Sequence, residues 1–149
     1  MPQAQQVINN AEKVRTWLRA CPKIASSKYF GADYIGDNAT EYALYTVPSS
    51  LKYRENIMGD RMLLSTQEQL FIFAAKVPYG SDVKQNLSNS LFIQDVAAWI
   101  QSQNAARNFP DWEGGRVTGI ECANTGAPVQ MSADAARYQF QIRVTYKVK

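Results

Sequence analysis

Residues 137–149, RYQFQIRVTYKVK, decide the fold class of this chain. Apolar or aromatic side chains occupy every second position, and glutamine, threonine or a cationic residue occupies the positions between them. Successive side chains of a strand point to opposite faces of its sheet, so the alternation predicts a strand with one buried face and one polar, cationic face. We expect the apolar face to pack under helices, and it consists of Tyr138, Phe140, Ile142, Val144 and Tyr146.

Two amphipathic helices are predicted upstream of this strand. The first spans about residues 4–20 and ends before Pro22, which cannot continue a helix. The second starts after a cap at Ser81 or Ser90 and runs to about Ala106. Apolar residues at helical spacing form the predicted buried stripe of each helix. They are Val7, Ala11, Val14, Leu18 and Cys21 in the first helix, and Leu87, Leu91, Val96, Trp99 and Ile100 in the second.

Further strands are predicted between and after the helices. Residues 41–47 form one, and residues 51–58 and 61–65 flank a hairpin turn at Gly59-Asp60. The second hairpin arm continues into residues 67–77, where the apolar run 70–75 predicts a central strand covered on both faces. A strand at residues 116–123 precedes the terminal one. This order predicts a single α+β domain over residues 1–149, with a mainly antiparallel sheet and both helices on one face.

Composition places the chain among globular proteins. It has 149 residues, of which 46% are hydrophobic and 19% charged, and its formal net charge is +3. The cations are dispersed, so a nucleic-acid-binding surface is not predicted. We see neither a membrane-spanning stretch nor a signal peptide, and therefore expect folding in the cytoplasm, with Cys21 and Cys122 reduced rather than joined in a disulfide.

The residues needed for common catalytic sites are missing from the sequence. It contains no histidine, and its two cysteines lie far apart, which excludes the usual nucleophile–base pairs and the local spacing of a zinc site. We also find no glycine-rich phosphate loop. The carboxylate pairs Asp33 with Asp37 and Asp111 with Glu113 are interpreted as turn or surface residues. We therefore expect no enzymatic activity, no cofactor and no metal ion.

Three regions are candidates for contacts with other subunits. The hairpin combines apolar and cationic side chains at Tyr53, Arg54, Ile57, Met58 and Arg61. Such a surface fits an interface, although a hairpin folded back onto its own helices explains it equally well. Trp112 lies in a loop without periodicity, where it is either an aromatic anchor or part of a local core. Gln141 and Arg143 lie on the polar face of the terminal strand, which we expect to line a subunit contact or a DNA passage.

Short motifs along nearly the whole chain resemble one family of phage proteins. They are Cys21-Pro22 after the first helix, Asp33-Tyr34-Ile35-Gly36, Thr46-Val47-Pro48, Tyr79-Gly80-Ser81-Asp82-Val83, Ala97-Ala98-Trp99-Ile100 and residues 136–142. Together these motifs resemble the tail terminator, or tail-completion, proteins of long-tailed bacteriophages and phage-tail-like particles. Some members of that family are called minor capsid proteins.

The resemblance implies a non-enzymatic structural subunit. Tail terminators are α+β proteins that form a hexameric ring on the last ring of the tail tube, stop its growth and offer a docking face to the head. The implied partners are further copies of the chain, the tail tube protein, and possible sheath and neck proteins, while phage DNA passes through without sequence-specific binding. The implied location is the head-proximal end of the tail in the virion, after assembly in the cytoplasm of the host bacterium. The alternatives are a neck or head–tail connector protein, a small-ligand or peptide-binding domain, and an enzyme that uses only carboxylates.

Overall fold

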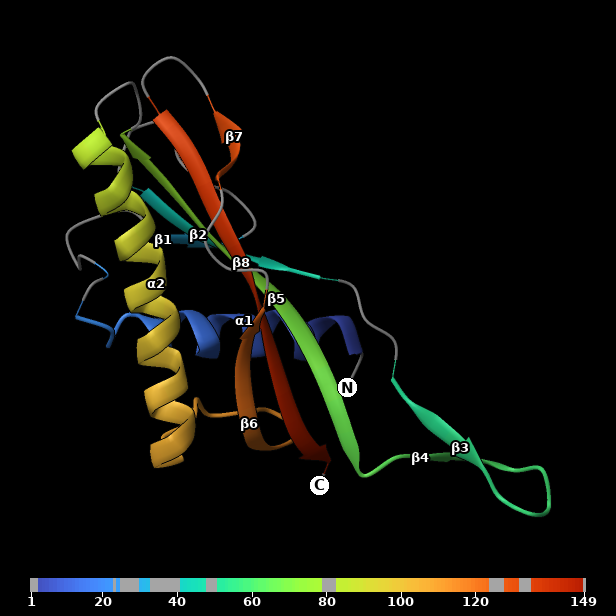
Figure 1. Cartoon of the computed structure of the whole chain (residues 1–149). Helices are drawn as coiled ribbons and strands as arrows, with labels where there is room; N and C mark the ends of the chain where they lie inside the picture. Colours follow the sequence, from blue (N-terminus) through green and yellow to red (C-terminus); the bar gives the residue numbers. More distant parts are fainter. Residues whose placement is uncertain are drawn as a thin grey trace.

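The computed structural model describes residues 3–22, 24, 30–32, 41–47, 51–78, 83–123, 128–131 and 135–148. Two helices and eight strands lie within these ranges. Figure 1 shows their arrangement. In chain order they are α1 (Gln3–Leu18), β1 (Phe30–Ala32), β2 (Glu41–Thr46), β3 (Tyr53–Glu55), β4 (Arg61–Leu63), β5 (Thr66–Pro78), α2 (Val83–Ala106), β6 (Gly115–Ala123), β7 (Pro128–Met131) and β8 (Ala135–Val148).

The main sheet has the strand order β1-β2-β5-β8-β6, and β7 also pairs with β8. All pairings are antiparallel except that of β1 with β2. The long strands β5 and β8 pair along their whole length, from Thr66 opposite Lys147 to Pro78 opposite Ala135. The α+β fold class with a mainly antiparallel sheet is therefore confirmed, as is the long terminal strand.

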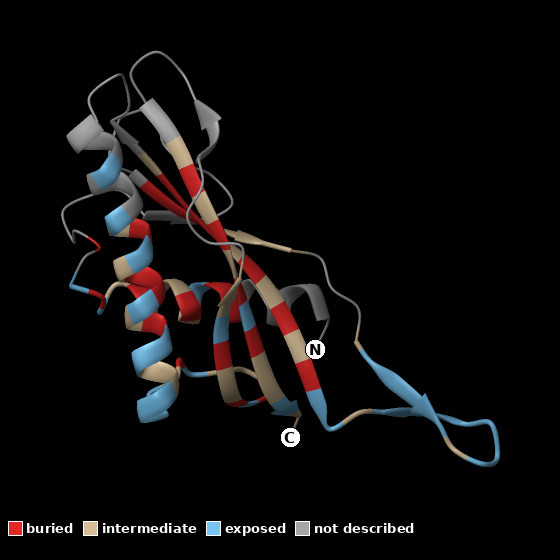
Figure 2. Ribbon diagram, in the orientation of Figure 1, coloured by how far each residue is buried: buried red, intermediate tan, exposed pale blue. Residues whose placement is uncertain are grey.

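One face of this sheet forms the core. Along β8, Tyr138, Phe140, Ile142 and Val144 are at most 2% exposed, and Phe71 and Phe73 of β5 are fully buried beside them. The alternation of buried and less buried residues is visible along the strands in Figure 2. Tyr146 is half-buried, and this burial raises the pKa of its phenol. The predicted orientation of the terminal strand is confirmed.

Both helices cover this core face. Val14 and Leu18 of α1 and Val96 and Ile100 of α2 are fully buried in the same cluster as the sheet residues. The rings of Trp17 and Trp99 meet between the two helices, with centroids 4.9 Å apart. The prediction that two helices pack on one face of the sheet is therefore confirmed, and Leu18 and Trp99 belong to or pack against the same core cluster as the apolar residues of the terminal strand.

The predicted buried stripe of α2 is wrong in its first half. Leu87 and Leu91 are 65% and 58% exposed, whereas Ile93, Val96 and Ile100 are fully buried. Leu91 precedes Val96 by five positions, which places it about 140° around the helix from the buried stripe. The alternative helix start at Ser90 is also wrong, because α2 already begins at Val83. Ser81 lies outside the described residues.

The face of β5 opposite the helices is only partly covered, contrary to the prediction for residues 70–75. Leu70 and Ile72 are half-buried there, while Ala74 is fully buried. The guanidinium of Arg137 lies 4.7 Å from the ring centre of Tyr45, and the strand register places Ala74 between these two residues. Both helices lie on the other face, so this open face is covered here by side chains of the sheet itself.

Cys21 and Cys122 are both thiols and are not joined in a disulfide, as expected. Cys21 is 1% exposed in the core, and Cys122 packs against the core from β6. Burial raises the pKa of the Cys122 thiol to about 12. At neutral pH Cys122 is therefore a protonated, poorly nucleophilic group, since the thiolate is the reactive form.

Candidate functional site

A hairpin that projects from the body is the most exposed apolar feature of the described chain. Strands β3 and β4 pair only with each other in a separate two-stranded sheet, and Figure 1 shows them extending away from the main sheet. At the tip, Ile57 is 100% and Met58 80% exposed. Tyr53, Met62 and Leu63 are each exposed by more than two fifths. The alternative in which this hairpin folds back onto its own helices is wrong.

The tip is an ordered turn built around Asn56. The Asn56 side-chain oxygen accepts hydrogen bonds from the Met58 and Asp60 amides at 2.9 and 3.0 Å. The Asn56 carbonyl accepts from the Gly59 amide at 3.0 Å, and Gly59 has a φ of +85°. This is the arrangement of a three-residue hairpin loop that ends in a left-handed glycine. The predicted turn at Gly59-Asp60 is therefore too short, because Ile57 and Met58 belong to the loop rather than to the first arm.

The base of the hairpin is fixed by the buried side chain of Gln67, which is 1% exposed. Its oxygen accepts from the Lys52 amide at 2.7 Å, and its nitrogen donates to the carbonyls of Lys52 and Leu64 at 2.8 and 2.9 Å. The Leu64 amide also donates to the Lys52 carbonyl at 3.0 Å. One side chain thus ties both arms to β5, which restrains the direction in which the hairpin projects.

Five of the predicted interface residues come together on this hairpin: Tyr53, Arg54, Ile57, Met58 and Arg61. Arg61 lies across the Tyr53 ring, with its guanidinium carbon 4.3 Å from the ring centre. Arg54 is opposite Met62 on the paired strand. Aromatic, methionine and arginine side chains, which are enriched at protein interfaces, therefore lie together on the hairpin surface.

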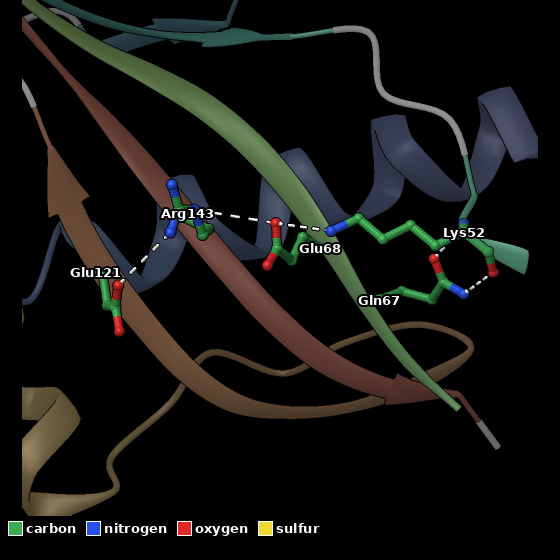
Figure 3. A network of polar contacts seen from close by, with 5 residues as sticks. All are labelled: Lys52, Gln67, Glu68, Glu121 and Arg143. Carbon is green, nitrogen blue, oxygen red and sulfur yellow. Dashed lines mark hydrogen bonds and ion pairs between the residues drawn. The ribbon is translucent and has the colours of Figure 1, made fainter. Parts of the chain in front are cut away.

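Arg143 belongs to a chain of ion pairs on the open face of the sheet (Figure 3). Its guanidinium lies 4.0 Å from Glu68 and 3.9 Å from Glu121, and Glu68 also contacts the Lys52 ammonium at 3.3 Å. These side chains are between 37% and 69% exposed, so the pairs contribute little stability. Gln141, paired with Ile72 and Ala123, is half-buried on the same face. The network thus connects the predicted polar face of β8 to the base of the hairpin.

Trp112 lies on the helix-covered face of the sheet, opposite the ion pairs of Arg143, at the edge of the core. Its ring is 4.9 Å from Tyr146 and 6.3 Å from Phe71, measured between centroids, and it packs against the core cluster. Its indole nitrogen is buried and has no hydrogen-bond acceptor in the described part of the chain. Most of the ring therefore belongs to a local core, the second of the two predicted alternatives.

The connection from α2 to β6, the start of β6 and Lys13 of α1 line an open groove of about 700 Å³. Phe109, Pro110, Trp112 and Val117 provide its apolar wall. Lys13, Arg107 and Arg116 line it with three cations, against one carboxylate from Asp111.

The adjoining segment is held to α1, because the buried Asn10 side chain accepts from the Glu113 amide at 2.6 Å and donates to the Glu113 carbonyl at 3.2 Å. Glu113 is thus a structural residue of this loop; Asp33 and Asp37 lie outside the described residues.

Sequence reasoning missed three parts of these surfaces. Gln67 occupies a position of β5 whose side chain points toward the core, and an amide at such a position indicates a buried hydrogen-bonding role. Its partners could not be predicted, because they belong to the hairpin connection. Leu87 and Leu91 form an exposed apolar pair on α2. The cations of the groove come from α1, the residue after α2 and β6, so only the fold brings them together.

The described ranges contain no group of three or more acidic or cysteine side chains placed to hold a metal ion. In the same ranges, no helix is long and apolar enough to cross a membrane. The expectation that the protein has no enzymatic activity stays a prediction.

Comparisons with known proteins support the fold alone. No protein-family model and no curated protein matches the chain. A solved structure whose name carries no functional description is similar to it, with a TM-score of 0.51 and 18% sequence identity. The match covers 99% of this chain and 97% of the other. At this identity the similarity concerns the arrangement of helices and strands, and it agrees with the α+β fold.

Proposed function

We propose that the protein is a non-enzymatic structural subunit of a bacteriophage tail or tail-like particle, acting as a tail terminator. In this role a ring of subunits, hexameric by resemblance to the family, caps the tail tube, stops its growth and gives the head a docking face. The sequence motifs described above supply the link to tails. The structural observation that carries the proposal is the projecting hairpin with its apolar tip.

An exposed apolar tip on an anchored base is poorly explained by folding alone. Ile57 and Met58 are almost fully exposed, while Gln67 and the Asn56 turn use several hydrogen bonds to hold them in one position. Burying a large apolar side chain contributes about 1.5–3 kcal/mol, so these two residues can stabilise a contact with another molecule. A preorganised contact element of this kind suits a subunit that assembles.

The position of the hairpin is compatible with a ring built from one repeated contact. It extends from the connection between the neighbouring strands β2 and β5, whereas β6 forms one edge of the main sheet. A contact between a patch on one side of a subunit and a different patch on the other side is heterologous, and a heterologous contact closes into a ring when its rotation permits.

The test is assembly of the purified protein. We expect a monomer or weak oligomer in dilute solution, and closed rings of uniform size at high concentration or on isolated tail tubes. Light scattering and negative-stain electron microscopy distinguish these states. Open filaments of this protein alone would contradict a terminator, since a terminator has to stop growth.

A protein that stays monomeric and binds tail tubes as an isolated subunit would instead favour a neck or connector role. Genes for tube, sheath or tape-measure proteins next to its own gene would support a place in a tail module. Neighbouring genes of metabolism would count against it.

A further inference from the structure

We infer that the groove at the start of β6 binds an extended, acidic segment of a partner protein, which adds to the sheet as a further strand beside Val117. The groove is the space lined by Lys13, the α2–β6 connection and the first residues of β6. The inference goes beyond the proposed function, because it assigns a contact surface separate from the hairpin and holds whether or not the chain forms a ring.

The start of β6 is a free edge of the main sheet. β6 pairs with β8 on one side, and within the described ranges no strand pairs with its other side. The Ile120 amide points to this outer side, where it donates to the Asn104 side-chain oxygen of α2 at 3.0 Å. A side chain therefore occupies the edge at Ile120, whereas residues 115–118 line the groove.

The backbone of Val117 is directed toward that outer side. The Val148 amide donates to the Ser65 carbonyl at 2.8 Å, on the β5 side of β8. Successive residues of an antiparallel strand bond to opposite neighbours, so Lys147 bonds toward Arg116 of β6, and Val117 directs its N–H and C=O outward. Among the described residues, no backbone hydrogen bond joins the α2–β6 connection to Val117. Such edge groups bind an extended peptide as an added strand.

The charge of the groove selects an acidic segment. Lys13, Arg107 and Arg116 line it against the carboxylate of Asp111. None of the ion pairs in the described part of the chain includes one of these three cations. An excess of cations at a contact surface complements a partner that carries negative charge.

Two further carboxylates belong to an adjoining pocket, and both already have partners. Glu12 pairs with Arg15 at 2.7 Å, and Glu113 accepts a hydrogen bond from the Asn9 side chain at 2.6 Å. They therefore do not compensate the cations of the groove directly.

The two sides of the groove fit a segment in which apolar and acidic residues alternate. Phe109 and Trp112 are half-buried against the core and form a wall on the helix-covered face of the sheet. The Val117 side chain is buried on the same face, so the preceding Arg116, which is exposed, belongs to the opposite face. An added strand directs alternate side chains to these two faces, with apolar residues toward the wall and acidic residues toward Arg116.

Neither a second copy's hairpin nor a nucleic acid fits this groove as well. The hairpin carries Lys52, Arg54 and Arg61 against Glu55 and Asp60, so its charge has the same sign as that of the groove. A nucleic acid has no peptide backbone to pair with an edge strand, and phosphate tracking needs a more extensive basic surface. An acidic protein segment satisfies both the edge and the charge.

The first test is an NMR titration of the isotope-labelled wild-type protein, at a concentration where it is monomeric. The probe is a synthetic peptide of alternating valine and glutamate, as long as β6. We expect saturable shifts of the amide signals of residues 115–118 and of the α2–β6 connection, and unchanged signals at the hairpin tip. No saturable shift up to about 1 mM peptide, or shifts confined to the hairpin, overturns the inference.

Three further probes separate charge from strand pairing. A peptide with lysine in place of glutamate should bind roughly tenfold more weakly. A glutamate peptide methylated at the backbone nitrogens that face β6 keeps its side chains but loses its N–H donors, so it should not bind. If either peptide binds as tightly as the original, or if an oligothymidylate binds the same residues more tightly, the inference is wrong.

A charge-reversed groove provides the matching protein variant. Lys13→Glu with Arg116→Glu should weaken binding of the glutamate peptide by about tenfold or more and strengthen binding of the lysine peptide. Arg54→Glu with Arg61→Glu is the control, since it makes the same change in net charge at two exposed hairpin residues. Circular dichroism checks that both variants fold. Equal weakening in both would reveal a general electrostatic attraction and overturn the inference.

Ring formation by the same variants distinguishes the inference from the proposed function. Ile57→Asp with Met58→Asp should lose rings and keep peptide binding, whereas Lys13→Glu with Arg116→Glu should keep rings and lose the peptide. If the reversed groove loses rings as well, the groove is a contact between copies, so the inference is wrong while the tail role stands. A wild-type protein that binds the peptide but forms no ring, in solution or on tail tubes, removes the terminator role and leaves the inference.

Discussion

Strand β8 and the β3–β4 hairpin contain similar side chains, but they differ in what covers them. In β8 the apolar residues fall on one face of a central strand, and two helices bury that face. In the hairpin Tyr53 and Leu63 share one face, Met62 lies on the other, and Ile57 and Met58 occupy the turn. A single layer of helices or strands from the same chain could bury only one of these surfaces of the hairpin. The alternating apolar residues of β8 therefore contribute to folding, whereas the exposed apolar residues of the hairpin are available for assembly.

The largest expected effect is on stability, from Phe140→Ala in β8. Phe140 is 1% exposed and its ring lies 5.3 Å from that of Phe73. Truncation of a buried phenylalanine costs about 3–5 kcal/mol, a large part of a total of about 5–15 kcal/mol. Thermal melting followed by circular dichroism should show a fall on the order of 10 °C.

The control for this prediction lies on the opposite face of the same strand. Arg143→Ala removes only long, solvent-exposed ion pairs, whose loss costs less than about 1 kcal/mol. Its melting temperature should stay close to that of the wild type. A large fall for Arg143→Ala together with a small one for Phe140→Ala would show that the strand faces are reversed.

Gly115→Ala should destabilise the edge of the sheet by a smaller amount. A Cβ atom at this position would collide with the backbone carbonyl oxygen of Lys147 on β8, so the strands would have to move apart. Overpacking of this kind costs about 1–3 kcal/mol. Chemical denaturation measures the loss, and Gly119→Ala is the matched control because its Cβ would lie 3.8 Å from the Asn104 oxygen. Equal losses for both glycines would refute the close-approach explanation.

Gln67→Ala should loosen the hairpin more than the body. The change leaves the Lys52 amide and the carbonyls of Lys52 and Leu64 without this partner, at a cost of about 1–3 kcal/mol. Hydrogen exchange should accelerate at the Leu64 amide while the amides in the centre of β8 keep their relative protection. Gln141→Ala, which changes a half-buried glutamine of the open face, serves as the control. Uniform acceleration over the whole chain would mean that Gln67 supports global rather than local stability.

The terminal strand and its faces were predictable from the sequence because period-two alternation over a long run permits one buried face, whereas the short strands β1 and β7 were not predicted. The position of the α2 stripe was not predictable, since Leu87 and Leu91 match helical spacing as well as Ile93, Val96 and Ile100 do. Contact with the sheet decides between the two faces. The turn was missed because the Asn56 side chain sets its length. Among the interface candidates, the hairpin residues and Arg143 are exposed, whereas Trp112 is mostly held in a local core, and aromatic character alone did not separate these environments.

The most direct test of the difference between core and assembly surfaces uses Ile57→Asp with Met58→Asp. Both side chains are almost fully exposed in the isolated subunit, so their replacement should leave the melting temperature unchanged. Melting and multi-angle light scattering are measured on the same sample, across concentrations at which the wild-type protein forms rings. The account predicts wild-type melting and a protein that stays monomeric. A lowered melting temperature, or rings of normal size and abundance, would contradict the assignment of the hairpin to assembly.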